Sequence, residues 1–369
     1  MKKNYIILSI ILWIVNYAAG QSDKSLKFFG DFRFRTEMER DLQNNSGYKL
    51  PVNDKLLFSF RFGVKYHYKS NWTFGGRIGT GNPEMPQSSD VEIGKGFTGK
   101  SISLNKAYVK FHKYNFYANL GKTGINIWEP DQILWDIDIN PEGIGLGKKF
   151  YLHNLGNISL KTGYYIAGNT SNYSGQSFKE YNYLATAQIK YNYNIFKHRF
   201  ILAPVYMEAH IPDYITEKIN YQIFTTYFEY RFMNNFKFNF DYFHNFQNLK
   251  NKVDPAWQDE KNGFLISASY KFYRRKFLAK ISYTEIEKYA VIDRFAQNDW
   301  VAWQTRDSNG IQYTRGSNFG GFAFSLNYRI NPEISTRIQF WKVETLQKAS
   351  FDKTPETGTR IRIDFNMKF

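Results

Sequence analysis

The sequence predicts an all-β fold, a transmembrane antiparallel β-barrel of about sixteen strands with short periplasmic turns and long extracellular loops. Three observations carry this prediction. Apolar and polar side chains alternate through many short segments, the N-terminus has the form of an export signal, and short turns alternate with long polar connections. The chain is also rich in aromatic residues, at 19%. Strands with two unlike faces explain how so many rings coexist with a polar composition.

The end of the chain, residues 358–369, shows the alternation most clearly. Successive side chains of a strand point to opposite faces, so one face is apolar and the other polar. The final residue, Phe369, resembles the end of the closing strand of bacterial outer-membrane barrels, which the barrel-assembly machinery reads. The apolar row is Ile361, Ile363, Phe365, Met367 and Phe369, and the polar row is Arg360, Arg362, Asp364, Asn366 and Lys368.

The same pattern recurs along the chain. We expect clear strands at 30–39, 56–68, 72–80, 158–167, 181–192, 236–245, 263–272, 277–284, 322–330 and 334–341. The segments 101–111, 116–121, 144–152, 199–208 and 219–232 are less regular, and their facing stays open. Alternation alone would also suit a soluble sandwich, whose second layer covers the apolar face.

The connections between these segments favour the membrane barrel. Short turns fall near 69–71, 233–235, 273–276 and 331–333. Long polar connections fall at 41–54, 82–100, 122–142, 246–260, 286–318 and 343–357. This alternation is typical of a barrel with short periplasmic turns and long extracellular loops, and bacterial single-chain barrels have an even number of strands.

The N-terminus predicts export. Lys2 and Lys3 precede an apolar run at 5–15, and Ala18-Ala19-Gly20 forms a small-residue cleavage site. The apolar run is too short for a membrane helix, which needs about 20 residues. We therefore expect a cleaved signal peptide at 1–20 and one outer-membrane barrel domain at 21–369.

Charge and motifs give no sign of catalysis. The formal net charge is +16, but the basic residues form no tract, and an exported protein is not expected to bind nucleic acid. The six histidines lack metal-ligand spacing, and no Gly-x-Ser-x-Gly motif is present. We expect no cofactor, no metal site and no catalytic residues, hence no enzyme.

Several segments carry a family resemblance. They are Gly30-Asp-Phe-Arg-Phe-Arg-Thr-Glu37, 60–65, 71–82, 104–109 and 134–143, with weaker similarity at 299–300, 315–319 and the last strand. In these segments the chain resembles the putative porin family of Gram-negative outer membranes, which is similar in style to phosphate-selective and general-diffusion porins. The resemblance implies a passive channel for small hydrophilic solutes or ions, and by analogy with porins of this size a homotrimer. Outer-membrane lipid and lipopolysaccharide would surround it.

In such a channel, function depends on charges that face the lumen. Neighbouring strands lie about 4.8 Å apart, so basic residues on the polar face of three consecutive strands should form one wall. The connection at 122–142 has the opposite character, because residues 123–147 include no Lys or Arg. The predicted basic wall is Arg33, Arg35, Arg61, Lys65 and Arg77, and the predicted acidic set is Glu129, Asp131, Asp136, Asp138 and Glu142.

The two sets predict a pore constriction. If the acidic loop folds into the pore, it faces the basic wall and produces a transverse field, with a weak preference for anions where Arg and Lys dominate. Alternatively, the acids point outward and the arginines only solvate a wide lumen. Three other functions stay open: a channel selective for a sugar, phosphate or organic anion, a barrel enzyme at the extracellular rim, and an adhesin that uses the loop at 286–318.

Overall fold

The computed structural model describes residues 24–81, 88–94, 96, 99–168, 182–212, 218–300, 305–306, 312–313, 316–348, 350 and 353–369. The predicted signal peptide, 1–20, lies outside these residues. No helix in the described part of the chain is long and apolar enough to cross a membrane.

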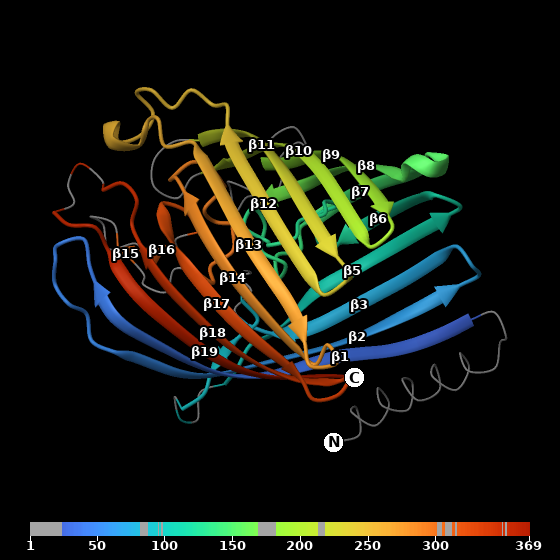
Figure 1. Cartoon of the computed structure of the whole chain (residues 1–369), viewed down its shortest axis with the longest axis horizontal. Helices are drawn as coiled ribbons and strands as arrows, with labels where there is room; N and C mark the ends of the chain where they lie inside the picture. The colour runs from blue at the N-terminus through green and yellow to red at the C-terminus, as the bar shows by residue number, and fades with distance from the viewer. Residues whose placement is uncertain are drawn as a thin grey trace, which may run out of the picture.

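The strands form a closed antiparallel barrel of 16 strands, as predicted (Figure 1). Each long strand pairs with the next long strand in the chain, and β1 pairs with both β2 and β19, which closes the ring. The first half comprises β1 (Lys24–Gln43), β2 (Asn53–Tyr68), β3 (Trp72–Thr80), β5 (Ile102–Lys113), β6 (Phe116–Lys122), β7 (Glu142–Tyr151), β8 (Asn157–Gly168) and β9 (Asn182–Ile195).

The second half completes the barrel. It comprises β10 (His198–Pro212), β11 (Lys218–Phe232), β12 (Phe236–Asn245), β13 (Asn262–Phe272), β14 (Phe277–Ile286), β17 (Phe319–Arg329), β18 (Ile334–Glu344) and β19 (Thr357–Lys368). Smaller elements lie in the connections: β4 (Val91–Glu92), which pairs with β2, the β15 (Thr305–Arg306) and β16 (Gln312–Tyr313) pair, and the 3-10 turns η1 (His153–Leu155) and η3 (Pro255–Trp257).

The alternation sorts side chains to the two faces of the barrel. In β1, Phe34 is exposed on the outer face, whereas Arg35 and Glu37 are buried on the lumen face. In β17, Phe322 and Phe324 likewise lie on the outer face. Exposed aromatic rows outside and buried charges inside are the arrangement expected when lipid surrounds the barrel.

The turns differ between the two ends of the barrel. The periplasmic turns are tight, and their residues adopt positive φ, as at Lys69 (52°), Met233 (51°) and Arg274 (53°). Apart from 213–217, the connections at the other end are long, and the one between β12 and β13 extends beyond the strands (Figure 1). The predicted rhythm of short turns and long loops is therefore present.

The irregular strand at 199–208 has a physical explanation. In β10, the lumen face carries Ala203, Val205 and Met207, all at most 1% exposed, while Leu202 and Tyr206 face outward. Both faces are apolar because other parts of the chain fill the lumen beside this strand. The alternation signal therefore disappears where the barrel interior is packed.

Candidate functional site: the charged lumen

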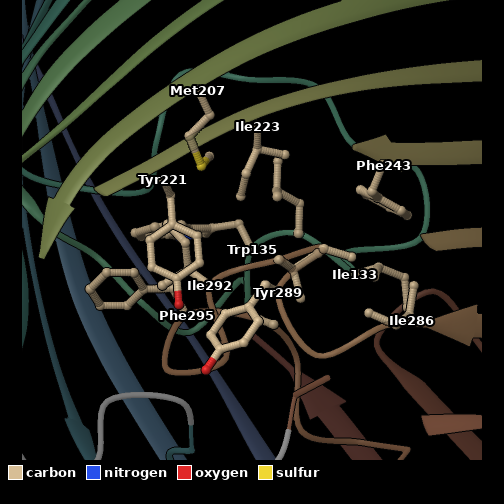
Figure 2. Packing of buried hydrophobic residues seen from close by; sticks show 14 of the residues in the cluster. Ile133, Trp135, Met207, Tyr221, Ile223, Phe243, Ile286, Tyr289, Ile292 and Phe295 are labelled. Carbon is tan, nitrogen blue, oxygen red and sulfur yellow. The ribbon is translucent and has the colours of Figure 1, made fainter. Parts of the chain in front are cut away.

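The connection between β6 and β7, residues 123–141, lies inside the barrel. Ile133 is 1% exposed and Trp135 is 5% exposed. Figure 2 shows both side chains in the lumen, among wall residues that include Met207, Ile223 and Phe243. Apolar burial of this extent stabilises the position of a loop inside the barrel. We call residues 123–141 the inner loop.

Hydrogen bonds tie the first part of the inner loop to the wall. The backbone N–H of Asn126 donates to the Tyr165 hydroxyl (2.6 Å), and its side-chain amide donates to the carbonyl of Leu146 (2.6 Å). Trp128 and Gln188 exchange two hydrogen bonds, at 2.8 and 2.9 Å. The loop is thus fixed to β7, β8 and β9 before it crosses the lumen.

Part of the connection between β14 and β17 also enters the lumen. Its Phe295 ring lies 4.9 Å from the Trp135 ring, and its carbonyl accepts from the backbone N–H of Asp136 (2.8 Å). Tyr289 and Ile292 belong to the same buried cluster (Figure 2). The polar composition of 286–318 predicts an extracellular loop, but its apolar run at 289–292 packs inside the barrel.

The arginines of β1 do not face the lumen as free charges. Arg33 and Arg35 both bind Asp90, at 2.6 and 2.8 Å. Arg35 also forms a second, bidentate contact with Asp364 of β19, the shorter bond being 2.6 Å. Asp90 lies in the connection between β3 and β5, directly before β4, and no pattern in the sequence points to this role.

The closing pair of strands carries a second set of ion pairs. Register places Glu37 opposite Arg362 and Glu39 opposite Arg360. The Arg362 guanidinium contacts Glu37 (2.5 Å) and also binds Asp299 from the connection between β14 and β17. Opposite charges therefore neutralise one another along the β1–β19 seam. Alternation predicts the lumen face for Glu37, Glu39, Arg360 and Arg362, but it does not predict which acid lies opposite which arginine.

The remaining predicted basic residues differ in their partners. Arg61 bridges Asp31 (2.8 Å) and Asp138 of the inner loop (2.5 Å). The Lys65 ammonium lies over the Phe29 ring, 4.4 Å from its centroid. Arg77 donates to Asn105 (2.9 Å) and forms no ion pair with the described residues.

The predicted acids are also divided. Asp138 meets the basic wall through Arg61. Asp131 lies against the opposite wall, where it binds Lys280 and Asn239. Although burial opposes ionisation, the Lys280 ammonium lowers the pKa of Asp131. Glu142 is the exposed first residue of β7, lines a cavity together with Asp138, and forms no ion pair with the predicted basic wall in the described structure.

Two acids of the inner loop are held in a largely uncharged form. Burial raises the pKa of Glu129 to about 8, and its carboxyl accepts from the Leu134 N–H (2.5 Å). Burial and the charges of Asp138 and Asp299 raise the pKa of Asp136 to about 8. Of the five predicted acids, only Asp138 forms an ion pair with the predicted basic wall in the described structure.

A further basic group was not foreseen. Lys161, Lys190 and Arg199 lie on the lumen face of the consecutive strands β8, β9 and β10, and we call them the basic patch. Lys190 lies 4.2 Å from the centroid of the Trp128 ring, and Arg199 donates to Asn192 (2.7 Å). Within the described residues, none of the three forms an ion pair. Two of them, Lys161 and Lys190, lie in the predicted strands 158–167 and 181–192, where alternation already places them on the polar face.

Comparisons with known proteins agree with this architecture. Residues 52–207 match the family described as putative porin. The solved structure of Salmonella typhi OmpF in complex with daunomycin superposes with a TM-score of 0.57 and 12% identity, covering 94% of this chain and 98% of that one. No curated protein matched.

Two other solved porins show the same fold. Pseudomonas putida OprB, in a high-pH structure, gives a TM-score of 0.59 at 9% identity, over 93% of this chain and 94% of that one. A triple mutant of the Rhodopseudomonas blastica porin gives a TM-score of 0.51 at 9% identity, over 94% of this chain and 100% of that one. These identities establish the fold alone. Together with the family match, they confirm the predicted resemblance.

Proposed function

Because the chain is a porin-type barrel of the Gram-negative outer membrane, we propose that it forms a passive channel for small hydrophilic solutes and ions, with a weak preference for anions. The observation that carries the anion preference is the basic patch. Lys161, Lys190 and Arg199 add three cations to the lumen wall without an ion-pair partner in the described chain.

The balance of paired and unpaired charge supports this sign. At the β1–β19 seam, acids bind the arginines at hydrogen-bond distance, so the field of each pair decays quickly with distance. The cations of the basic patch have no such partner among the described residues, so their field extends further into the lumen. Rings of Arg and Lys favour anions in pores, and the basic patch occupies three adjacent strands.

The contact of Arg61 with Asp138 supports a constriction between wall and loop. It brings a cation of β2 and an anion of the inner loop to 2.5 Å, on the side of the lumen opposite the Asp131–Lys280 contact. We propose that solutes pass beside this pair, where a local transverse field orients dipolar molecules. Arg33 and Arg35 act there mainly by holding Asp90, and Lys65 and Arg77 supply the unpaired positive charge.

Reversal potential in a salt gradient tests the proposal. Purified protein in a planar bilayer should give discrete conductance steps, and its reversal potential should show chloride to be the more permeant ion. The triple variant Lys161→Gln, Lys190→Gln, Arg199→Gln should shift that potential toward cations. A fully inserted barrel without conductance steps would refute the channel, and an unshifted potential would refute the role of the basic patch.

Enzymatic activity is a weaker alternative. The family and the fold point to a channel, and the described residues contain no group of three or more His, Asp and Glu side chains that could hold a metal ion. An adhesin role for 286–318 loses support, because residues 289–296 of that connection pack inside the barrel.

Partners and processing stay proposals. We propose that a signal peptide, 1–20, directs export, that the assembly machinery reads the closing strand, and that the protein is a homotrimer surrounded by lipid and lipopolysaccharide. The exposed aromatic rows support contact with lipid. Chemical cross-linking of intact membranes would test the trimer, since a ladder that ends at the dimer would contradict it.

A further inference from the structure

A cavity of about 410 Å³ lies in the lumen between the barrel wall and the inner loop. Its size falls within the range of small-molecule sites, about 300–1,000 Å³. Arg77, Ser103 and Asn105 line it from β3 and β5, and Trp135 and Asp138 line it from the inner loop. The side formed by β3 and β5 is therefore polar and basic, the Trp135 ring makes another side apolar, and Asp138 and Glu142 are the carboxylates of the lining.

Arg77, in the wall of this cavity, has a like charge on the neighbouring strand. Register places Arg77 of β3 directly opposite Lys106 of β5. Like charges in directly opposite positions destabilise a sheet. Arg77 uses its Nε to donate to Asn105 (2.9 Å), and among the described residues no carboxylate forms an ion pair with either Arg77 or Lys106.

The local backbone adds to this picture. The register of β3 and β5 shifts between Arg77 and Ile78, so that Asn105 is an extra residue in β5. Bulges of this kind re-aim side chains and are frequent beside functional sites. Here the bulge brings Asn105 to the Arg77 guanidinium and leaves both in the wall of the cavity.

We propose that the cavity is a binding subsite for a small hydroxylated carboxylate of the sugar-acid class. The proposal rests on the channel function and names a solute class for it. The solute carboxylate lies between the terminal nitrogens of Arg77 and the Lys106 ammonium, and relieves their repulsion. A carboxylate matches the fork of an arginine in a bidentate contact.

The rest of the cavity selects the hydroxylated part of the solute. The Ser103 hydroxyl and the Asp138 carboxylate provide hydrogen-bonding groups, and Trp135 provides a flat apolar surface for the carbon skeleton. The amide of Asn140 donates to the backbone carbonyl of Asp138 (2.8 Å) and fixes this part of the loop. A simple inorganic anion would use only the cations, and a neutral sugar would leave them unpaired.

Sodium gluconate serves as the probe, with sodium acetate and glucose as comparisons. Binding is measured by calorimetry on detergent-solubilised protein, and block is measured on KCl currents in a planar bilayer. We expect gluconate to bind and block at a concentration at least tenfold lower than acetate or glucose. Equal potency of acetate or of glucose would refute the sugar-acid assignment.

Two variants and a control localise the site. Arg77→Gln and Lys106→Gln should each raise the half-blocking concentration of gluconate at least tenfold. Arg337→Gln removes a cation from the lumen face of β18, outside the cavity, and should leave that concentration within about twofold. Equal effects in all three would show that general charge, not the cavity, determines block.

Failure of this proposal is distinguishable from failure of the channel. KCl steps without gluconate binding would overturn the subsite and leave the channel intact. Gluconate binding in calorimetry without any KCl steps would overturn the channel and support the binding site.

Discussion

Arg61 of β2 and Asp138 of the inner loop form an ion pair at 2.5 Å that joins the barrel wall to the segment crossing the lumen. Both side chains are mostly buried, at 19% and 15% exposure. Arg61 keeps a second partner, Asp31, on the neighbouring strand. The pair is therefore the point at which the predicted basic wall and the predicted acidic loop meet.

Removing this contact should loosen the inner loop without unfolding the barrel. Asp138→Asn retains the side-chain shape, and Arg61 still binds Asp31. Hydrogen bonds to charged groups contribute about 1.5–3 kcal/mol, so the local opening of the loop should become easier by roughly that amount. Hydrogen exchange at the amides of residues 133–139 measures it. Asp31→Asn, which removes the other partner of Arg61, is the matched control and should leave this exchange unchanged. Exchange in Asp138→Asn no faster than in the native protein would contradict the role of the pair.

The Arg35–Asp364 pair should matter for global stability. Both side chains are buried, at 7% and 2% exposure, and the contact closes the barrel between β1 and β19. Breaking a buried pair by removing one partner costs about 3–5 kcal/mol. We expect Asp364→Asn to lower the free energy of unfolding by about 3 kcal/mol, measured by urea titration of the protein folded into lipid vesicles.

An exposed pair provides the control for that measurement. Arg40 and Asp54 also lie 2.5 Å apart, but at 33% and 56% exposure. Solvent screens such pairs, so Asp54→Asn should leave the unfolding midpoint essentially unchanged. Similar losses of unfolding free energy in Asp364→Asn and Asp54→Asn would mean that burial does not decide how much these ion pairs contribute to stability.

Docking of the inner loop should depend on pH. Burial raises the pKa of Asp136 and of Glu129 to about 8, above their usual values of 3.8 and 4.5. Both groups are neutral in the docked and undocked loop below about pH 4, so their own contribution to docking is largest there. This contribution of Asp136 and Glu129 is lost progressively as the pH rises toward and through about 8.

The matched variants remove this titration. Asp136→Asn keeps the acceptor that receives the Asp138 N–H (2.8 Å), and Glu129→Gln keeps the acceptor for the Leu134 N–H. We expect loop amide exchange in the native protein to accelerate between about pH 5 and pH 9, beyond the intrinsic dependence. The double variant should show only the intrinsic change. An identical pH profile in both proteins would show that Asp136 and Glu129 are not the origin of the pH dependence.

The chain end should matter for assembly more than for conduction. Phe369 exchanges two backbone hydrogen bonds with Gly30, at 2.9 and 3.1 Å, and its ring covers the position where a Gly30 side chain would lie. Deleting Phe369 should lower the amount of barrel in the membrane and leave the conductance of each assembled channel unchanged. Membrane levels equal to those of the native protein would count against it.

A second substitution separates recognition from packing. In Gly30→Ala, the new Cβ would lie 2.5 Å from the Phe369 ring and 2.6 Å from the Arg61 carbonyl oxygen, so the packing of the ring is disturbed while the terminal phenylalanine itself is retained. If the assembly machinery reads the terminal aromatic itself, this variant should assemble normally and unfold at lower urea. If Gly30→Ala reduces assembly as severely as the deletion does, the assembly defect of the deletion results from lost packing against β1.

Local patterns were sufficient where one face of a strand meets lipid and the other meets polar surroundings. Ile361, Ile363 and Phe365 were assigned to the outer face, and Arg33 and Arg61 to the lumen, because strand periodicity alone fixes facing. The same rule failed at β10, whose inner face is apolar. Periodicity reports a difference between two environments, and there the two were alike.

Pairings distant in sequence could not be read in this way. Asp90 reaches Arg33 across 57 positions, and Asp364 reaches Arg35 across 329. Neither contact follows from spacing, because barrel closure and loop entry bring these groups together.

The sequence by itself determined the barrel, its two faces and the lumen position of its basic residues, since these depend on alternation within single strands. Only the tertiary structure decided which charges are neutralised. Register places Glu37 against Arg362, and the inner loop delivers Asp138 to Arg61 but Asp131 to the opposite wall. Alternation constrains a side chain to a face, whereas the partner it meets there depends on the path of other segments through the lumen.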